Sequence, residues 1–235
     1  MRQPVVISGE KISLLLISSV MCMLVLSVFW QGTRAVGSHF EGGHVVMIDP
    51  GHGGYDPGAI TSKGVYEKSI NLQIAKKVKE MLGPSGIEVF LTREEDIDFA
   101  SDGVKGKSTK KQIDLNRRID MANEAKAEIF VSIHVNATAG GQKSGAETFY
   151  NIESDSGKWL AELIQQELIK IPRMNRRIAK PGDYYIIRNS NIPAVIVEVG
   201  YLSSVKEQKK LQQSWYQEQL SRAIAKGIAN YLGLP

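Results

Sequence analysis

The sequence is almost without cysteine and has few histidines. Among its 235 residues there is one cysteine, Cys22, and there are four histidines. Because a disulfide joins two cysteines, the chain cannot form one within itself, whatever its compartment. Cys22 is also a poor acceptor for a lipid anchor, because bulky Val20 and Met21 precede it where small residues are expected. No internal repeat is visible.

Composition and length indicate one ordinary folded domain with a distinct N-terminus. Hydrophobic residues make up 43% of the chain, which is typical of globular proteins and argues against disorder. Beyond an N-terminal stretch of about 40 residues, the chain is long enough to bury one substantial core. The net charge of +4 fits a solvated basic surface and also fits attraction to an anionic polymer. Composition alone leaves both interpretations open.

The N-terminus carries a segment that is long enough to cross a membrane. Ile12 to Trp30 is a run of nineteen residues without a charged side chain. Arg2 and Lys11 precede it, so the charge bias predicts a cytoplasmic N-terminus and an exported remainder. An uncleaved anchor and a cleaved signal peptide both fit, but no good small-x-small cleavage site follows, which favours the anchor. The predicted regions are a signal or anchor segment over 1–31, a linker over 32–43 and a catalytic domain over 44–235.

Short apolar runs alternate with amphipathic segments in the rest of the chain. The runs are apolar throughout, as strands covered on both faces should be, whereas the amphipathic segments have the spacing of helices. This alternation predicts a single α/β domain with a mostly parallel twisted sheet flanked by helices, of phosphorylase/hydrolase-like type. The predicted strands are 44–49, 87–92, 129–135, 147–151, 184–188 and 194–199. The predicted helices are 67–82, one marked by Leu115, Ile119 and Ala122, one from Trp159 to Leu168, and 214–231 with a capping box of Ser214 and Gln217; residues 94–111 are predicted as a polar surface loop.

Two histidines in the body of the chain stand at the ends of predicted strands. His52 lies in a glycine-rich turn after the first strand, and His134 lies at the end of 129–135. Each has a plain structural alternative, which is a tight turn or anion-binding nest for His52 and a core histidine bonded to backbone for His134. Ligands in open α/β sheets bind at the carboxyl ends of strands, so the two positions together favour a shared site.

Two glutamates stand in comparable places. Glu67 begins a predicted helix, where an acid could simply complement the helix dipole. Glu198 lies inside the apolar run 194–199, where a carboxylate is costly unless it is paired or used. A buried ion pair with Arg93 or Arg188 is the structural alternative for Glu198.

Two histidines and one carboxylate are a donor set typical of catalytic zinc, which keeps a fourth position open for water. His52 and His134, with one of the two glutamates, Glu67 or Glu198, could therefore hold Zn²⁺. The other glutamate could then act as the base that the water needs.

Further residues are candidates for supporting these ligands. An imidazole ligand needs a partner for its second nitrogen, and Asp49 and Asn136 stand close enough in sequence to provide one. Asn71 lies one helical turn after Glu67 on the same face, so we expect it to steady that carboxylate.

Four blocks of sequence occur in a fixed order along the chain. The first runs from Asp49 to Leu72 and contains the pattern Gly64-x-x-Glu67-Lys68-x-x-Asn71; the others are Leu91–Arg93, Ser132–Ala137 and Pro193–Tyr201. Together they resemble the zinc-dependent N-acetylmuramoyl-L-alanine amidases of the amidase-3 type, over residues 44 to 233. In that family the first block carries a metal-ligand motif and the last carries the catalytic glutamate. The block with Arg93 matches as well, without a defined role for the arginine.

The resemblance implies a hydrolase that cuts the amide bond between N-acetylmuramic acid and the L-alanine of the stem peptide in peptidoglycan. Zinc held by His52, Glu67 and His134 would polarise the lactyl carbonyl, and Glu198 would pass a proton from water to the leaving amine. The implied partner is peptidoglycan, not nucleic acid, and any activator protein is unidentified. The enzyme would act outside the cytoplasmic membrane, either anchored by its N-terminal segment or secreted.

The layout of the chain also resembles one subgroup of that family. An N-terminal apolar segment precedes a single catalytic domain, and only 64 positions separate His134 from Glu198. This arrangement resembles the sporulation-associated CwlD-type amidases, which strip peptides from spore cortex before muramic δ-lactam, a mark read during germination, is completed. Two other functions remain open at this point. One is a zinc peptidase acting on a peptide bond, and the other is a non-catalytic wall-binding module of the same fold.

Overall fold

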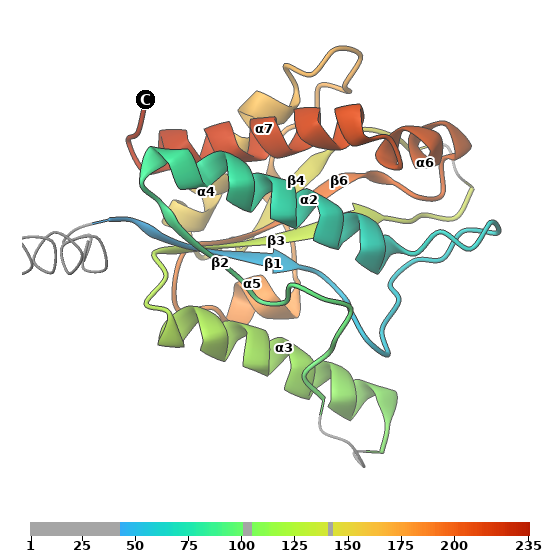
Figure 1. The fold of residues 1–235 in the computed structure, drawn as a ribbon, viewed down its shortest axis with the longest axis horizontal. Helices are drawn as coiled ribbons and strands as arrows, with labels where there is room; N and C mark the ends of the chain where they lie inside the picture. The colour runs from blue at the N-terminus through green and yellow to red at the C-terminus, as the bar shows by residue number, and fades with distance from the viewer. Residues whose placement is uncertain (1–42, 101–104, 141–142) are drawn as a thin grey trace, which may run out of the picture. The chain divides into compact units, whose positions relative to one another are not determined.

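A six-stranded sheet lies between two layers of helices in the computed structural model, which describes residues 43–100, 105–140 and 143–235 (Figure 1). The strand order is β2-β1-β3-β6-β4-β5. The first four strands in that order run parallel, β4 is antiparallel to β6, and β5 is parallel to β4. Their bounds are β1 Val45–Pro50, β2 Glu88–Leu91, β3 Ile129–Asn136, β4 Glu147–Tyr150, β5 Lys180–Pro181 and β6 Ala194–Tyr201. The predicted α/β fold with a mostly parallel sheet is confirmed.

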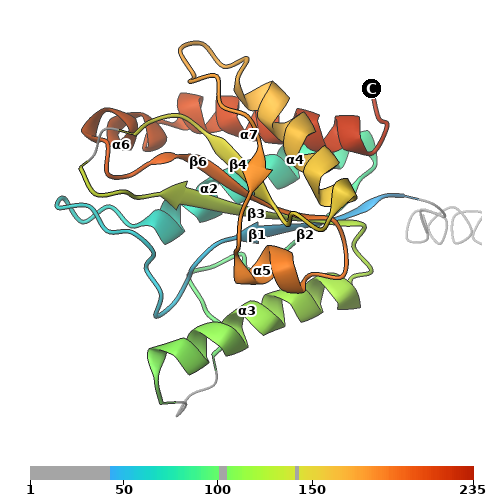
Figure 2. The ribbon, with the colours of Figure 1, turned by 180° about the vertical axis from the view of Figure 1, so that it is seen from behind.

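Helices cover both faces of this sheet. Helices α2, α4 and α7 form one layer, and α3 and α5 lie on the opposite face, as the views from the front and from behind agree (Figures 1 and 2). The bounds are α2 Glu67–Leu82, α3 Lys107–Glu124, α4 Asp155–Leu168, α5 Tyr185–Asn189, α6 Val205–Leu211 and α7 Ser214–Tyr231, with a 3₁₀ turn at Gly83–Ser85. Because both faces are covered, successive residues of a central strand enter two different cores.

Strand β1 shows how the two cores arise. Val46 and Ile48 pack into the larger core with α2, α4 and α7, whereas Met47 packs into the smaller one with α3 and α5. All three side chains are at most 1% exposed. Continuous apolar strands are therefore required by burial on both faces, which is why the sequence pattern identified them.

The long helices that line the larger core follow their sequence pattern closely. The predicted bounds of α2 and α7 agree with the structure, and the four-residue stripe of α2 is buried. The capping box predicted for α7 is wrong, because Gln213 is the N-cap and its side chain caps nothing. The side chain of Gln217 instead donates to Gln73 and to the carbonyl of Leu211. Gln217 therefore makes tertiary hydrogen bonds in place of the predicted capping interaction.

Two other predictions need correction. Residues 184–188 form no strand, because α5 occupies Tyr185–Asn189 and the amide of Arg188 donates to the carbonyl of Tyr184. Ile186 and Ile187 are neighbours and both enter the smaller core, which a short helix permits and an alternating strand does not. The polar segment 94–111 is only partly a loop, since α3 already begins at Lys107. Helix α6 and the two-residue strand β5 were not predicted.

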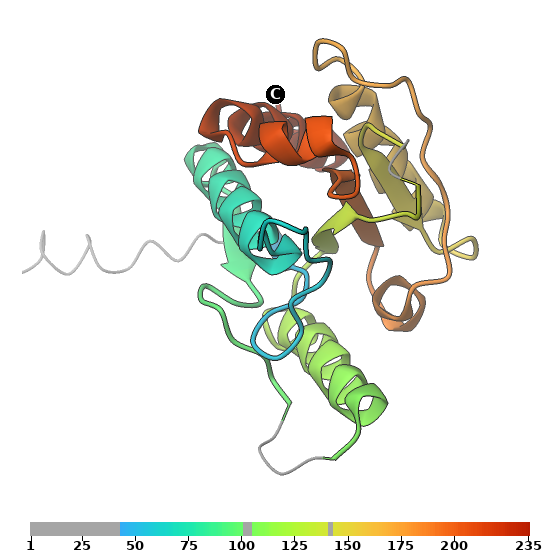
Figure 3. The same ribbon diagram turned by 90° about the vertical axis from the view of Figure 1, so that its right-hand side faces the viewer.

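The carboxyl ends of β1, β3 and β6 open on one edge of the sheet, which faces the viewer in Figure 3. Across residues 43–100, 105–140 and 143–235, no helix has the length and apolar character needed to span a membrane. The predicted segment Ile12–Trp30 and the linker lie outside the described residues.

Candidate metal centre

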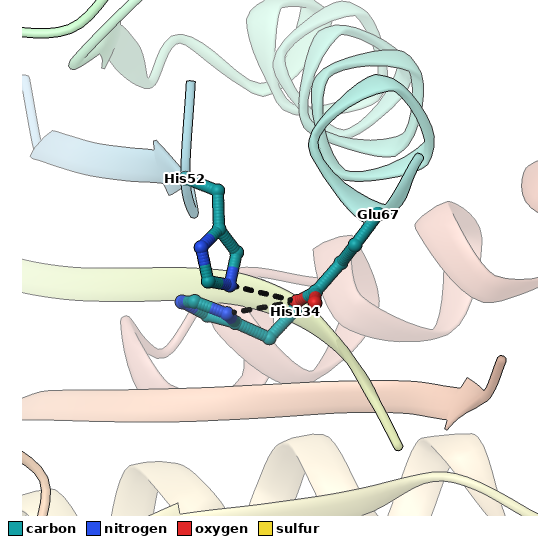
Figure 4. Close-up of side chains that lie close together, drawn as sticks. All are labelled: His52, Glu67 and His134. Atoms are coloured by element: carbon teal, nitrogen blue, oxygen red, sulfur yellow. Dashed lines mark hydrogen bonds and ion pairs between the residues drawn. The ribbon is translucent and has the colours of Figure 1, made fainter. Parts of the chain in front are cut away.

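The three predicted ligands come together at this edge of the sheet. His52 follows β1, Glu67 is the first residue of α2, and His134 stands in β3. The carboxylate oxygen Oε1 of Glu67 lies 3.1 Å from Nε2 of His52 and 3.1 Å from Nδ1 of His134. Figure 4 shows both imidazole rings pointing at this carboxylate. One donor atom from each residue lies within 4.8 Å of the others, so a single ion could be held between them.

The imidazole of His52 is oriented by its own turn. His52 has φ of 63°, and the chain then turns so that Asp56 Oδ2 lies 2.8 Å from Nδ1. An ionised carboxylate only accepts, so Nδ1 donates its proton to Asp56, and this contact directs the opposite nitrogen, Nε2, into the site. Burial alone would lower the pKa of His52, but hydrogen bonds to Asp56 and Glu67 outweigh it and raise the pKa to about 9.

Asp56 is a supporting residue that the sequence interpretation missed. The role was predicted for Asp49 or Asn136, but within the described chain neither side chain hydrogen-bonds to His52 or His134. The signal that could have identified Asp56 is its position four residues after His52 in a glycine-rich turn. Its pKa is raised by burial but lowered more by the hydrogen bond from His52, to about 2, so it stays ionised.

Glu67 is held as a buried anion. Its Oε1 accepts from the amide of Val135 at 3.1 Å, and its Oε2 accepts from the amide of Ala59 at 2.8 Å. Burial raises the pKa of Glu67, but hydrogen bonds from His134 and His52 outweigh it and hold the pKa far below its ordinary range. Asn71 Nδ2 lies 3.4 Å from Oε1, which confirms the expected support.

Two glycines make room for these side chains. A Cβ atom on Gly51 would lie 2.2 Å from Nε2 of His134, and one on Gly58 would lie 2.5 Å from Oε2 of Glu67. Both distances are far inside van der Waals contact. The glycine pattern around His52 therefore serves the placement of the other two side chains as well as the turn itself.

Two buried arginines fix the backbone that carries His52. Arg93 donates from Nε to the carbonyl of Pro50 at 2.9 Å and from Nη2 to that of Gly51 at 3.1 Å. Arg118 donates from Nη2 to the carbonyl of His52 at 2.8 Å and from Nη1 to that of Pro50 at 3.0 Å. Three consecutive carbonyls are thus bound by charged donors, which gives Arg93 a structural role and makes Arg118 a residue that the sequence interpretation missed.

Arg118 is itself held by a buried ion pair. Its Nη1 lies 2.6 Å from Oδ1 of Asp49, and each side chain is 1% exposed. Asp49 also accepts from Thr92 Oγ1 at 2.6 Å and from Ser132 Oγ at 2.5 Å. Burial raises the pKa of Asp49, but Arg118 and the two hydroxyls outweigh it and keep the pKa below its usual value. The pair joins β1, β3 and α3 directly beneath the histidine turn, with Asp114 as a second partner of Arg118.

Glu198 stands beside the cluster without a partner of its own. It is paired in register with His134 across β3 and β6, and its Oε2 is buried with no hydrogen bond to any described residue. The ion pair considered for it is not formed, because Arg93 binds carbonyls and Arg188 pairs with Asp183. Burial, followed by the charge of Glu67, raises the pKa of Glu198 to about 8. A carboxylate in this state can hold or release a proton near neutral pH.

The donor set suits zinc on chemical grounds. Two imidazole nitrogens and one carboxylate oxygen are ligands that catalytic zinc accepts, and the carboxylate–histidine contact through Asp56 is the support such a ligand needs. Oε2 of Glu198 is buried without a hydrogen bond to any described residue, as expected where a further group bound in the site would supply that hydrogen bond. Fold and site together define an α/β protein with a candidate metal centre at the carboxyl edge of its sheet.

Comparison with known proteins gives the family. The family Amidase_3, described as N-acetylmuramoyl-L-alanine amidase, matches residues 46–230. The chain therefore belongs to the amidase-3 family of N-acetylmuramoyl-L-alanine amidases, which are hydrolases.

Individual relatives agree with this assignment. The germination-specific N-acetylmuramoyl-L-alanine amidase of Bacillus subtilis (strain 168) is 36% identical over 190 residues, covering 80% of each chain. The sporulation-specific amidase of the same organism is 32% identical over 194 residues, covering 80% of this chain and 68% of the relative. The CwlD amidase from Clostridioides difficile, solved in complex with the GerS lipoprotein, superposes with a TM-score of 0.77 at 39% identity, covering 81% of this chain and 98% of that one.

Gly51→Ala tests the room made for His134. The added methyl group would overlap the imidazole, so we expect the ring to move and the affinity for zinc to fall by about 10–100-fold, as when the support of a ligand is lost. Gly83→Ala is the matched control, because its Cβ would meet nothing within 4 Å. Competition with a chromophoric chelator measures both affinities. Equal zinc affinity in the two variants would show that the close contact at Gly51 does not matter.

Asp49→Asn tests the buried ion pair and has a defined pH dependence. At neutral pH the variant should lose about 3–5 kcal/mol of unfolding free energy, because Arg118 loses its charged partner. The folded-state pKa of Asp49 lies below 3.8, so its ionisation stabilises the fold above that pH, and this contribution is lost as the pH falls through the folded pKa. The difference between parent and variant should therefore be complete above pH 3.8 and shrink as the pH falls below that ordinary pKa.

Urea titrations in the presence of a chelator measure this difference without a contribution from bound metal. Asp183→Asn is the control, because Asp183 is exposed and its one ion-pair partner in the described part of the chain is exposed Arg188; we expect a change within about 0.5 kcal/mol. A loss for Asp49→Asn that is the same at all pH values would contradict the assignment of a depressed pKa.

Proposed function

We propose that the protein is a zinc-dependent N-acetylmuramoyl-L-alanine amidase that cleaves the amide bond between N-acetylmuramic acid and the L-alanine of the stem peptide. In this proposal His52, Glu67 and His134 are the zinc ligands, and Glu198 is the catalytic acid–base. The observation that carries it is the buried, unpartnered Oε2 of Glu198 beside a three-residue donor set in a chain of this family. The catalytic domain is assigned to residues 44–235.

The chemistry follows from the protein's own groups. When bound, zinc would supply Lewis-acid polarisation of the lactyl carbonyl and would lower the pKa of water. Glu198 takes a proton from the attacking water and returns it to the nitrogen of the leaving alanine, which its raised pKa permits in both directions. Asp56 keeps the proton of His52 on Nδ1, and the buried arginines hold the turn so that Nε2 stays directed at the site.

The substrate context is proposed from the relatives. Two of them carry names that refer to germination and sporulation, and the solved relative is a CwlD amidase. We assign this chain to the modification of spore cortex peptidoglycan, in which removal of the stem peptide precedes formation of muramic δ-lactam. The alternatives are a zinc peptidase with the same metal chemistry and a wall-binding module without activity.

The location and partner follow the same reasoning. The substrate lies outside the cytoplasmic membrane, and residues 1–31 have the length and charge bias of a signal or anchor segment. The C. difficile relative was solved with a lipoprotein, so a lipoprotein activator at the membrane surface belongs to the proposal. Protease added outside intact protoplasts should digest the domain, and protection until the membrane is broken would contradict this placement.

Glu198→Gln tests the assigned acid–base. Glutamine has nearly the same shape but cannot accept the proton, so turnover of peptidoglycan should fall by about 10²–10⁴-fold while zinc remains bound. Glu218→Gln is the matched control, because Glu218 is half-exposed on α7 and its side-chain partners among the described residues are Lys77 and Ser214. Zinc content is measured by elemental analysis and turnover by release of amino groups. A near-normal rate for Glu198→Gln would remove it from the mechanism.

Product analysis separates the proposal from its alternatives. An amidase should leave free lactyl groups on muramic acid and free N-terminal alanine on the released peptides, because it cuts only the bond between them. A peptidase would expose amino groups within the stem peptide and leave the lactyl amide intact. Mass spectrometry of digests of spore cortex and of vegetative peptidoglycan distinguishes these outcomes. Faster release from cortex supports the sporulation role, and equal rates speak against it.

A further inference from the structure

The functional groups are arranged across the sheet in a definite order. The donor set lies at β1, β3 and the start of α2, Glu198 lies on the next strand β6, and beyond it come β4 and β5. Adjacent strands lie about 4.7–4.9 Å apart, so groups on neighbouring strands are separated by about that distance across the sheet. A substrate whose carbonyl lies at the donor set and whose leaving nitrogen lies at Glu198 therefore has its departing portion directed toward β4 and β5.

A second carboxylate stands at that position. Glu147 on β4 is directly opposite Glu198 in the antiparallel register, so the two side chains project from the same face of the sheet. Unlike Glu198, it is fully partnered. Its Oε1 accepts from Arg177 Nη1 at 3.0 Å and lies 2.7 Å from Lys180 Nζ, and its Oε2 accepts from the hydroxyl of Tyr201 at 3.2 Å.

Two cations contact Glu147, and a second buried carboxylate, Glu207, lies near one of them. The charge of Arg177 also acts on Glu207, whereas Lys180 has Glu147 as its one ion-pair partner among the described residues. The side chain of Lys180 is 47% exposed and that of Arg177 is 26% exposed, so both reach solvent on the outer side. An ammonium has three donors and a guanidinium five, and the contacts named here leave some of them free.

The segment that supplies these cations is anchored and strongly basic. Residues 169–181 contain two lysines and three arginines and no acidic residue. The segment is fixed to the chain before β4, because Asn175 Nδ2 donates to the carbonyl of Ser144 at 2.8 Å and Arg177 Nε donates to the same carbonyl at 3.2 Å. Arg177 is therefore held beside Glu147 before any ligand arrives, and Lys180 pairs with the same carboxylate, which reduces the ordering cost of binding.

We propose that Arg177 and Lys180, positioned by Glu147, form a subsite for a carboxylate on the second residue of the leaving peptide. This inference rests on the proposed function. In peptidoglycan that second residue is glutamate joined through its side-chain carboxyl, so its α-carboxylate is free unless it is amidated. Two extended residues span about 6.6–7.2 Å, which carries the carboxylate one to two strand spacings beyond the leaving nitrogen. Lys180 stands on β5, two strands beyond β6, and Arg177 contacts Glu147 on the strand between them.

The test compares two substrates that differ only at this carboxylate. Muramyl tripeptide glycans are prepared with glutamate or with its α-amide, isoglutamine, at the second position, and kcat/KM is measured for each. The parent enzyme should favour the acid by about tenfold, which corresponds to one charge-assisted contact of about 1.4 kcal/mol. Lys180→Met should bring the ratio close to one, and Lys180→Arg should restore it. Restoration by the second variant excludes loss of folding as the cause.

Lys170→Met is the matched control. Lys170 belongs to the same basic segment, but it pairs with Glu167 on α4 and is 66% exposed, so its loss should leave the tenfold ratio unchanged. Equal cleavage of both substrates by the parent enzyme would overturn the subsite while the proposed function stands. A preference for the acid that survives Lys180→Met would also overturn it. Failure to cleave either substrate would contradict the proposed function and the subsite together.

Discussion

The buried ion pair between Asp49 and Arg118 is the contact on which the site depends. It ties the end of β1 to α3 and, through Ser132, to β3, and the remaining donors of Arg118 bind the carbonyls that lead into His52. A buried pair of this kind is weak evidence for stability, because apolar residues of similar volume often stabilise a fold as well or better. Its value here is geometric. Charged donors bind three consecutive carbonyls, and this holds a histidine with φ of 63° in one orientation.

Two buried glutamates on neighbouring strands show how hydrogen-bond and ion-pair partners set the pKa of a carboxyl group. Glu147 and Glu198 face each other across β4 and β6, and both are buried. Glu147 is surrounded by two cations and a tyrosine hydroxyl, which hold its pKa below the usual value although burial raises it. Glu198 lacks such partners among the described residues, and burial raises its pKa to about 8. The same side chain is thus a fixed anion in one place and a group that can exchange protons in the other.

Much of the fold could be predicted because the strongest patterns are periodic. Strands buried on both faces must be apolar throughout, and α2 and α7 must carry an apolar stripe toward the core. Burial therefore imposes a sequence pattern from which these elements can be recognised. The prediction failed where the pattern is too short to have a period. Residues 184–188 contain four consecutive aromatic or β-branched residues, which suit a strand, yet packing of Ile186 and Ile187 into the smaller core produces a helical turn.

The sequence by itself determined the alternation of strands and helices, and it marked His52, Glu67, His134 and Glu198 as chemically unusual at their positions. Only the tertiary structure decided which groups meet. His134 and Glu67 are 67 positions apart, and Arg118 and Asp49 are 69 positions apart. Asp56, Arg118 and Glu147 have no local signature strong enough to assign a role. Their roles come from contacts with residues that the fold brings to one sheet edge, and the partners that each buried carboxylate finds there set which carboxylates are ionised.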